Sequence, residues 1–269
     1  MPFVLLFFAL FAALWALIVV IGPTVERLLS RAAHLTAKFR YRDYLPVFVL
    51  LAAGAAIAAL AGNLFVELAE SLQSESPQMQ QVDTMIHAWA HETRTQASTT
   101  FFTILTVIGT PVGLAIIGAV IVAILLIKKR WLWALYLFLT SASGGLLNLQ
   151  LKAFFARARP ELAEALREAH GYSFPSGHAM GSAVVFGALA YLAFRVVNDW
   201  RQRGALVSLC LSMIVAISAS RIYLGVHWIS DVVAGMAAGT IWVITTTVAY
   251  ETFRRIRLVR SLRQKREAQ

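Results

Sequence analysis

The chain has 269 residues, of which 59% are hydrophobic and 14% are charged, with a formal net charge of +10. Soluble domains carry roughly a quarter charged residues, so this composition excludes an ordinary soluble domain and indicates an integral membrane protein. Most of the basic residues flank apolar runs, where they set membrane topology, and this placement argues against binding of nucleic acid.

Uncharged runs along the chain approach or exceed the roughly 20 residues that a helix needs to cross a bilayer. The first run has no basic residue before it and no clear cleavage site, so we expect a retained span rather than a signal peptide. The chain is therefore expected to be all-α, a polytopic membrane helical bundle. The seven predicted spans are 3–21, 45–66, 101–127, 131–151, 178–195, 204–220 and 229–250.

The segment between the second and third spans carries Asp83, His87 and His91 at intervals of four residues, with Trp89 between the histidines. Such spacing could form a metal site on one helix face. The favoured interpretation is an amphipathic helix at the membrane interface with Trp89 as its anchor. Further along, Pro111 is expected to kink or start the third span.

The distribution of Lys and Arg predicts the orientation of the bundle. Of the 24 basic residues, 18 fall on one side of the seven-span arrangement, including the loop after the first span and the C-terminal tail. The positive-inside rule places that side in the cytoplasm. The N-terminus and the segments that carry Lys152, Arg157, Arg159 and Arg221 are then expected outside.

Lys152 and Arg159 lie seven residues apart after the fourth span, so they share a helix face if that helix continues. Pro160 disfavours helix at Arg159 and is expected to end it there. Two cations at this position could bind an anion or simply reach lipid headgroups.

The stretch Pro175-Ser176-Gly177-His178 precedes the fifth span. Ser176 suits a helix N-cap, and the N–H groups of Gly177 and His178, with the helix dipole behind them, could bind an anion. Gly177 allows the backbone to approach a ligand closely. The alternative is a capped helix with an interfacial histidine.

In the last motif, His227 and Asp231 lie at i and i+4 and share a helix face. The carboxylate can accept the Nδ1–H of His227, which leaves Nε2 as a nucleophile or base. Arg221 can offer two parallel donors to phosphate, and a structural ion pair is the alternative. The pattern of Gly235 and Gly239 predicts close helix packing rather than a ligand site.

These three stretches face the same predicted side, and together they supply three cations and two histidines. Because carboxylates are few there, we expect phosphate to be held without a metal or another cofactor. The short linker at 161–174 leaves little room for a separate domain over the site. The nearby carboxylates are Glu161, Glu164, Glu168 and Asp231.

The motifs read Lys-x6-Arg-Pro, Pro-Ser-Gly-His and Ser-Arg-x5-His-x3-Asp, in this order. In these motifs the chain resembles the type-2 phosphatidic-acid phosphatase superfamily, in its membrane lipid phosphatase branch. The resemblance implies a six-span phosphatase core at 45–250. An extra N-terminal span and basic cytoplasmic loop at 1–44 precede it, and a basic cytoplasmic tail at 251–269 follows.

The resemblance also implies a role for each matching residue. His227 would attack phosphorus and form a phosphohistidine, Asp231 would orient His227, and His178 would protonate the leaving oxygen and then activate water. The residues expected to hold the phosphate oxygens are Lys152, Arg159, Ser176, Gly177 and Arg221.

The implied function is metal-independent hydrolysis of a lipid phosphate or diphosphate at the outer face of a bacterial inner membrane. Undecaprenyl diphosphate, phosphatidylglycerol phosphate and phosphatidic acid are candidate substrates. Three alternatives stay open: a phosphotransferase of the same family, a non-enzymatic lipid transporter, and a vanadate-dependent peroxidase. The seven spans argue against the last, because those relatives are soluble.

Overall fold

The structure is a computed structural model that describes residues 2–35, 45–160, 166 and 170–267. Two groups of charged residues therefore lie outside the described residues. They are the loop cations Lys38, Arg40 and Arg42 and the carboxylates Glu161, Glu164 and Glu168.

The described residues form helices and no strand, which confirms the prediction of an all-α fold. Helices α7 and α8 begin and end within a few residues of the predicted spans. Most of the other helices are longer than the spans predicted for them. Helix α9, for example, continues well past residue 250. The helices are α1 (Pro2–Leu35), α2 (Leu45–Gln73), α3 (Pro77–Glu92), α4 (Gln96–Ile108), α5 (Pro111–Ile127), α6 (Trp131–Phe155), α7 (Gly177–Val196), α8 (Trp200–Tyr223) and α9 (Ile229–Glu267).

Within the described ranges, six helices are long and apolar enough to cross a membrane, and the pair α4 and α5 could form a seventh span. These two helices meet at an angle of 57°. Gly109 ends α4, and the hydroxyl of Thr110 caps α5, whose first residue is Pro111. Proline suits the first turn of a helix, so Pro111 starts α5 and produces the expected break.

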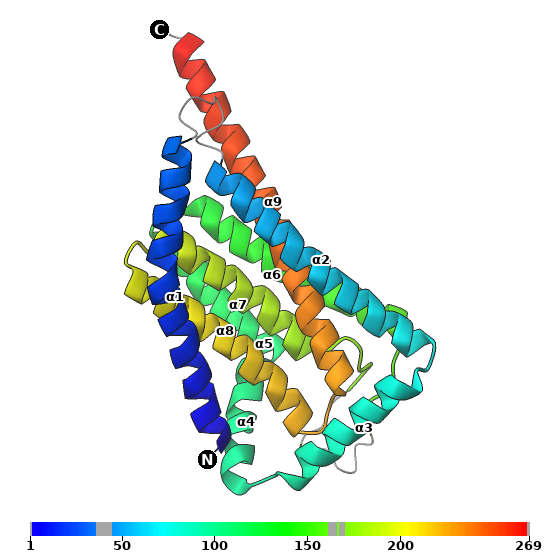
Figure 1. The fold of residues 1–269 in the computed structure, drawn as a ribbon. Helices are drawn as coiled ribbons and strands as arrows, with labels where there is room; N and C mark the ends of the chain where they lie inside the picture. The colour runs from blue at the N-terminus through cyan, green and yellow to red at the C-terminus, as the bar shows by residue number, and fades with distance from the viewer. Residues whose placement is uncertain (1, 36–44, 161–165, 167–169, 268–269) are drawn as a thin grey trace.

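Helix α7 is the centre of the bundle and packs against α5, α6, α8 and α9 (Figure 1). Helix α1 lies along α8, and α2 lies along α9. Helix α3 crosses one end of the bundle, where it contacts α8 and α9. The chain termini lie at opposite ends, and the N-terminus is at the end that carries α3.

Close packing of α7 and α9 depends on glycine. A Cβ at Gly235 would lie 2.7 Å from the backbone oxygen of Ser176, and a Cβ at Gly239 would lie 2.7 Å from that of Met180. The small residues therefore let the two backbones approach, as the sequence pattern predicts. This contact sets the position of the Ser176 turn relative to α9.

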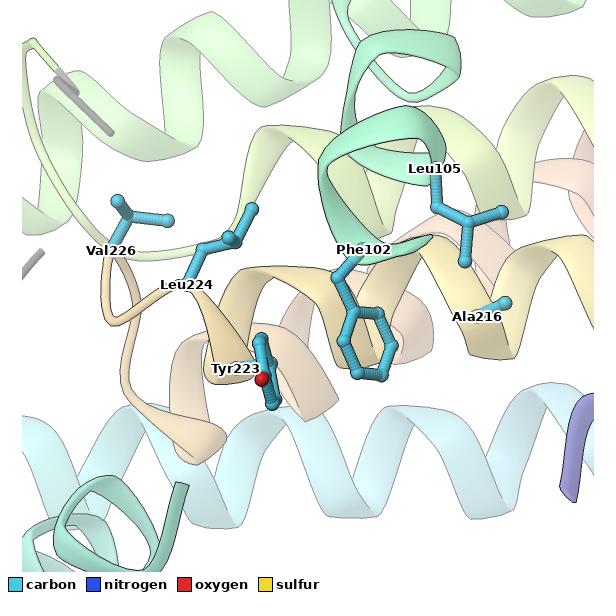
Figure 2. Packing of buried hydrophobic residues seen from close by; sticks show 6 residues of the cluster. All are labelled: Phe102, Leu105, Ala216, Tyr223, Leu224 and Val226. Atoms are coloured by element: carbon cyan, nitrogen blue, oxygen red, sulfur yellow. The ribbon is translucent and has the colours of Figure 1, made fainter. Parts of the chain in front are cut away.

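A buried apolar cluster fixes the turn between α8 and α9 (Figure 2). Phe102 on α4 packs against Tyr223 at the end of α8, with ring centroids 4.5 Å apart. Leu224 and Val226, within the turn itself, are fully buried. The turn that carries His227 is thus anchored in the core on one side.

Candidate active site

His227 lies in the turn between α8 and α9, and Asp231 lies in the first turn of α9. Their side chains are 2% and 0% exposed, and Nδ1 of His227 is 3.3 Å from Oδ2 of Asp231. The hydroxyl of Ser173 is 3.2 Å from the same Nδ1 and donates to Oδ2 at 2.5 Å. The predicted pair of His227 and carboxylate is therefore formed, with Ser173 as an additional partner.

The contacts of His227 define which nitrogen carries the proton. Arg159 Nη1 lies 3.1 Å from Nε2 of His227, and a guanidinium can only donate hydrogen bonds. Nε2 must therefore accept with its lone pair, and the proton sits on Nδ1, facing Ser173 and Asp231. In this tautomer the lone pair lies on Nε2, which is then the nitrogen able to act as a nucleophile or a base.

Burial lowers the pKa of His227 from its ordinary value of 6.5 to about 4, even though Asp231 acts in the opposite direction. The positive charges of Arg159 and Arg221 add to the lowering. At neutral pH the imidazole is therefore neutral, and its lone pair is available for attack on an electrophile.

Asp231 is held by donors from several parts of the chain. Its Oδ2 also accepts from the backbone N–H of Trp228 at 3.0 Å, and its Oδ1 accepts from Arg157 Nη1 at 2.6 Å. A buried carboxylate is costly unless it is paired and hydrogen-bonded, and this one is both. Its position against His227 is consequently fixed.

Ser176 is the N-cap residue of α7, as predicted, but its hydroxyl makes no capping hydrogen bond. Its backbone N–H donates to the carbonyl of Asp231 at 2.9 Å, which ties the second motif to the third. The Ser176 Oγ and the His178 Nε2 atoms are buried without a hydrogen-bond partner. Two such polar atoms beside the first N–H groups of a helix suit an anionic ligand.

The helix that carries Lys152 does not continue to Arg159, so the condition for a shared helix face is not met. Helix α6 ends at Phe155, and Ala156 adopts a left-handed conformation with φ of 46°. The two cations meet through a loop, because both donate to the carbonyl of Tyr172, Lys152 Nζ at 2.6 Å and Arg159 Nη2 at 3.3 Å. Burial lowers the pKa of Arg159, while the charge of Asp231 opposes the shift.

Arg221, 6% exposed, lies in the last turn of α8 and donates to the hydroxyl of Thr106 on α4 at 2.5 Å. His178 also forms a hydrogen bond with the backbone of Thr106. It interacts electrostatically with Arg221, His227 and Arg159. Gly177 faces α6, since a Cβ there would lie 3.6 Å from Cε of Lys152. All eight sequence-predicted residues therefore gather at one end of the bundle.

The three residues of the possible metal motif on α3 point to different surroundings. Asp83 is buried and pairs with Arg157, and the ring of His87 lies 5.5 Å from that of Trp228. His91 is exposed, as is Trp89. In the described part of the chain, no three His, Cys, Asp or Glu side chains are grouped as metal ligands. This arrangement agrees with the amphipathic helix.

Sequence reasoning did not assign four further residues to this site. Three of them contact a predicted site residue, and Asp83 reaches Asp231 through Arg157. They come from a helix or loop remote from their partners, so spacing along the chain gives no signal for them. Arg157 has a weak signal, because it is one of the few cations outside the cytoplasmic set. The four are Asp83, Thr106, Arg157 and Ser173.

Comparison with known families gives a match over residues 133–255 to the model described as the PAP2 superfamily. This segment contains α7, α8, most of α6 and α9, and all three motifs. Residues 133–255 are therefore similar to the PAP2 superfamily, and this match confirms the resemblance drawn from the motifs.

Two curated relatives are each similar to somewhat less than half of the chain. Phosphatidylglycerophosphatase B of Bacillus subtilis is 34% identical over 113 residues, which are 42% of this chain and 55% of the relative. Lipid A 1-phosphatase of Rhizobium etli is 32% identical over 135 residues, 45% of this chain and 51% of the relative. The chain thus spans about half the length of the curated relatives it matches.

A solved structure extends the similarity to most of the bundle. The crystal structure of a transmembrane PAP2-type phosphatidylglycerolphosphate phosphatase from Bacillus subtilis superposes with a TM-score of 0.67 at 26% identity. The superposition covers 72% of this chain and 96% of that one. The helical membrane fold of this protein is therefore that of membrane PAP2 phosphatases.

Proposed function

We propose that this protein is a metal-independent lipid phosphatase that works through a phosphohistidine on His227. The observation that carries the proposal is the geometry of His227. Its Nδ1 is backed by Asp231, and its Nε2 lone pair faces Arg159 within a group of three cations. The names of the PAP2 relatives, which are lipid phosphatases, support the same class of reaction.

The first half of the reaction follows from the atoms that are available. Nε2 of His227 attacks phosphorus while the bond from phosphorus to the lipid oxygen breaks. For this step His178 is the imidazolium, protonated on both ring nitrogens in the presence of the bound phosphate. The lipid oxygen takes the proton from its Nε2, which is the nitrogen without a hydrogen-bond partner. Arg159 turns from Nε2 of His227 to the phosphate oxygens, because phosphorus and the guanidinium compete for the same lone pair.

The second half returns the enzyme to its starting state. His178 removes a proton from water, the water oxygen bonds to phosphorus, and the bond to Nε2 of His227 breaks with release of inorganic phosphate. The negative charge on the oxygens is balanced by Lys152, Arg159 and Arg221 and by the N-terminus of α7, with Ser176 and Gly177. Phosphoryl transfer depends mainly on such positioning and charge stabilisation.

We infer that the substrate is a lipid whose phosphate lies at the outer membrane surface. The site lies at the end of helices long enough to span a bilayer, so a phosphate can reach it while the acyl chains stay in the membrane. The basic residues gather toward the opposite end, where the C-terminus of α9 lies, and this supports an extracytoplasmic site. The phosphatase core would then be 45–250, as the sequence predicts, with residues 1–44 and 251–269 as additions.

The test is release of phosphate from lipid phosphates by purified protein in detergent with EDTA. The panel contains phosphatidylglycerol phosphate, phosphatidic acid, undecaprenyl diphosphate and lipid A 1-phosphate. Wild type is expected to release phosphate from at least one lipid, and His227→Ala is expected to release none. General acid–base catalysis contributes about 10² to 10⁴-fold, so His178→Ala should lose activity in that range.

His91→Ala is the matched control, because His91 is an exposed histidine at the same end of the bundle. It should retain wild-type release. Loss of activity in this variant together with a requirement for added divalent metal would contradict the proposal, as would release by His227→Ala. Appearance of the phosphate on a second lipid instead of in solution would identify a phosphotransferase.

A further inference from the structure

Arg157 bridges two buried carboxylates from distant parts of the chain. Its Nη1 donates to Oδ1 of Asp231 at 2.6 Å, and its Nη2 donates to Oδ2 of Asp83 at 2.7 Å. The side chains of Arg157, Asp83 and Asp231 are 12%, 3% and 0% exposed. None of the three lies at a surface where water would screen the charges strongly.

Asp83 is held as firmly as Arg157. Its Oδ1 accepts from the backbone N–H of Ser230 at 3.0 Å, and its Oδ2 accepts from the Ser230 hydroxyl at 2.7 Å. Asp83 is one of two buried residues on α3, a helix otherwise largely open to the surroundings. A carboxylate costs free energy when it is buried, so its placement against the start of α9 requires a reason beyond the packing of α3.

The charges alternate along this array. Asp83 is negative, Arg157 is positive and Asp231 is negative, while the imidazole of His227 becomes positive when Nε2 bonds to phosphorus. If Arg157 were the only partner of Asp231, its positive charge would neutralise the carboxylate. No net negative charge would then remain beside the imidazole of His227 to stabilise its positive form. Asp83 restores a net charge of minus one to the array, and Arg157 holds Asp231 in the orientation that His227 requires.

We propose that Arg157 and Asp83 are positioning residues of the phosphatase site, which act on His227 through Asp231. Arg157 fixes the orientation of Asp231, and Asp83 maintains the negative charge that stabilises the phosphorylated imidazole. Helix α3 is thereby part of the active site, although it carries none of the three motifs. This inference rests on the proposed function and adds two residues to it.

Two single variants separate charge from structure, because they change the charge of the array in opposite directions. Asp83→Asn leaves a net charge of zero near His227, so the pKa of the imidazole falls. Arg157→Gln leaves two carboxylates, so that pKa rises. The other charged or titratable groups around His227 are the same in both variants: Lys152 on α6, Arg159 after α6, His178 on α7 and Arg221 on α8.

The experiment measures kcat and the acidic limb of kcat/KM against pH, with the lipid phosphate that wild type hydrolyses. Asp83→Asn is expected to lose about 10 to 100-fold in kcat, as for groups that orient the ligands of a metal. Its acidic limb should move to lower pH, and that of Arg157→Gln to higher pH. In the double variant the limb should return toward that of wild type, because Asp231 then supplies the net charge alone.

Glu92→Gln, an exposed carboxylate on α3, and Arg130→Gln, an exposed arginine, are the matched controls and should behave as wild type. Arg157→Gln removes the cation between two buried carboxylates and therefore costs stability. Asp83→Asn, which is close in shape to the native residue, is the decisive variant. The inference is overturned if folded Asp83→Asn has the wild-type kcat and its acidic limb of kcat/KM lies at the wild-type pH. It is also overturned if folded Asp83→Asn and Arg157→Gln lose kcat equally and their acidic limbs do not move in opposite directions.

These results are distinguishable from failure of the proposed function itself. If wild type releases no phosphate without metal, or if His227→Ala remains active, the proposed function fails. If wild type is active and His227→Ala is not, while Asp83→Asn equals wild type, only the role of the array is wrong.

Discussion

Arg159 donates a guanidinium N–H to Nε2 of His227 across 3.1 Å, and the same nitrogen atom of Arg159 donates to the carbonyl of Val226 at 2.8 Å. The cation thus holds the nitrogen that is the nucleophile in the proposed mechanism. Because a guanidinium has no acceptor, the contact fixes the neutral tautomer of His227 with the proton on Nδ1. The proposed reaction then requires that Nε2 exchange this hydrogen bond for a bond to phosphorus.

The first prediction concerns pH. Burial lowers the pKa of His227 to about 4, so the imidazole is neutral above that value and protonated below it. Protonation removes the lone pair of Nε2, and kcat/KM should therefore fall as pH drops through about 4 rather than through 6.5. Measurement of kcat/KM between about pH 3.5 and pH 8 checks this. A decrease in kcat/KM near the ordinary histidine pKa of 6.5 would show that burial does not lower the pKa of His227.

Arg159→Lys should be a poor replacement although it keeps the positive charge. Arg159 uses Nε, Nη1 and Nη2 to reach carbonyls of Gly171, Val226 and His170, and an ammonium group cannot span this arrangement. A hydrogen bond to a charged group is worth about 1.5 to 3 kcal/mol, so loss of one predicts a decrease of roughly 10 to 150-fold in kcat/KM.

Arg130→Lys is the control for this substitution, because Arg130 is an exposed arginine in the turn between α5 and α6. It should leave kcat/KM unchanged. Full activity of Arg159→Lys would mean that Arg159 supplies only charge and not a directed set of donors.

Gly177→Ala should weaken substrate binding without unfolding the protein. The added Cβ would lie 3.0 Å from Oδ1 of Asn148 and 3.6 Å from Cε of Lys152, so it enters the space beside the N-terminus of α7. Overpacking costs about 1 to 3 kcal/mol, and we expect KM to rise by roughly 5 to 150-fold. In the matched variant Gly145→Ala the Cβ meets open space, and KM should stay constant. An unchanged KM in folded Gly177→Ala would show that the N-terminus of α7 does not contact the substrate.

The expected orientation can be tested by labelling single cysteines in intact cells. The native Cys210 is buried and can be replaced by serine, after which Glu92→Cys on α3 and Lys129→Cys after α5 each provide one exposed thiol. A membrane-impermeant maleimide should label the variant at position 92 and spare the variant at position 129. The reverse pattern would place the site in the cytoplasm.

Much of the fold was predictable because the apolar runs are long and bounded by turn residues. Helix α7 (Gly177–Val196) agrees closely with the predicted span 178–195, since Pro175 and Ser176 precede it and no strong charge interrupts it. The end of α9 was not predictable from apolar runs. Its helix continues to Glu267 through a charged segment that hydropathy assigns to a tail.

The motif residues of the site were predictable because their spacing is fixed along the chain. Their supports were not, because Arg157 meets Asp83 across 74 residues and Ser230 meets Asp83 across 147. The shared helix face of Lys152 and Arg159 failed for a local reason: the backbone turns at Ala156, four residues earlier than Pro160 suggests. Spacing along the chain predicts neither these long-range contacts nor the point at which the backbone leaves the helix.

The most direct test of the central claim is identification of the phosphorylated residue. A lipid substrate labelled with ³²P in the scissile phosphate is mixed with wild-type protein, quenched in alkali within a single turnover, digested and analysed by mass spectrometry. We predict an alkali-stable, acid-labile phosphate on His227 that is absent from His227→Ala. Phosphate on another residue, or full turnover by His227→Ala, would contradict the account.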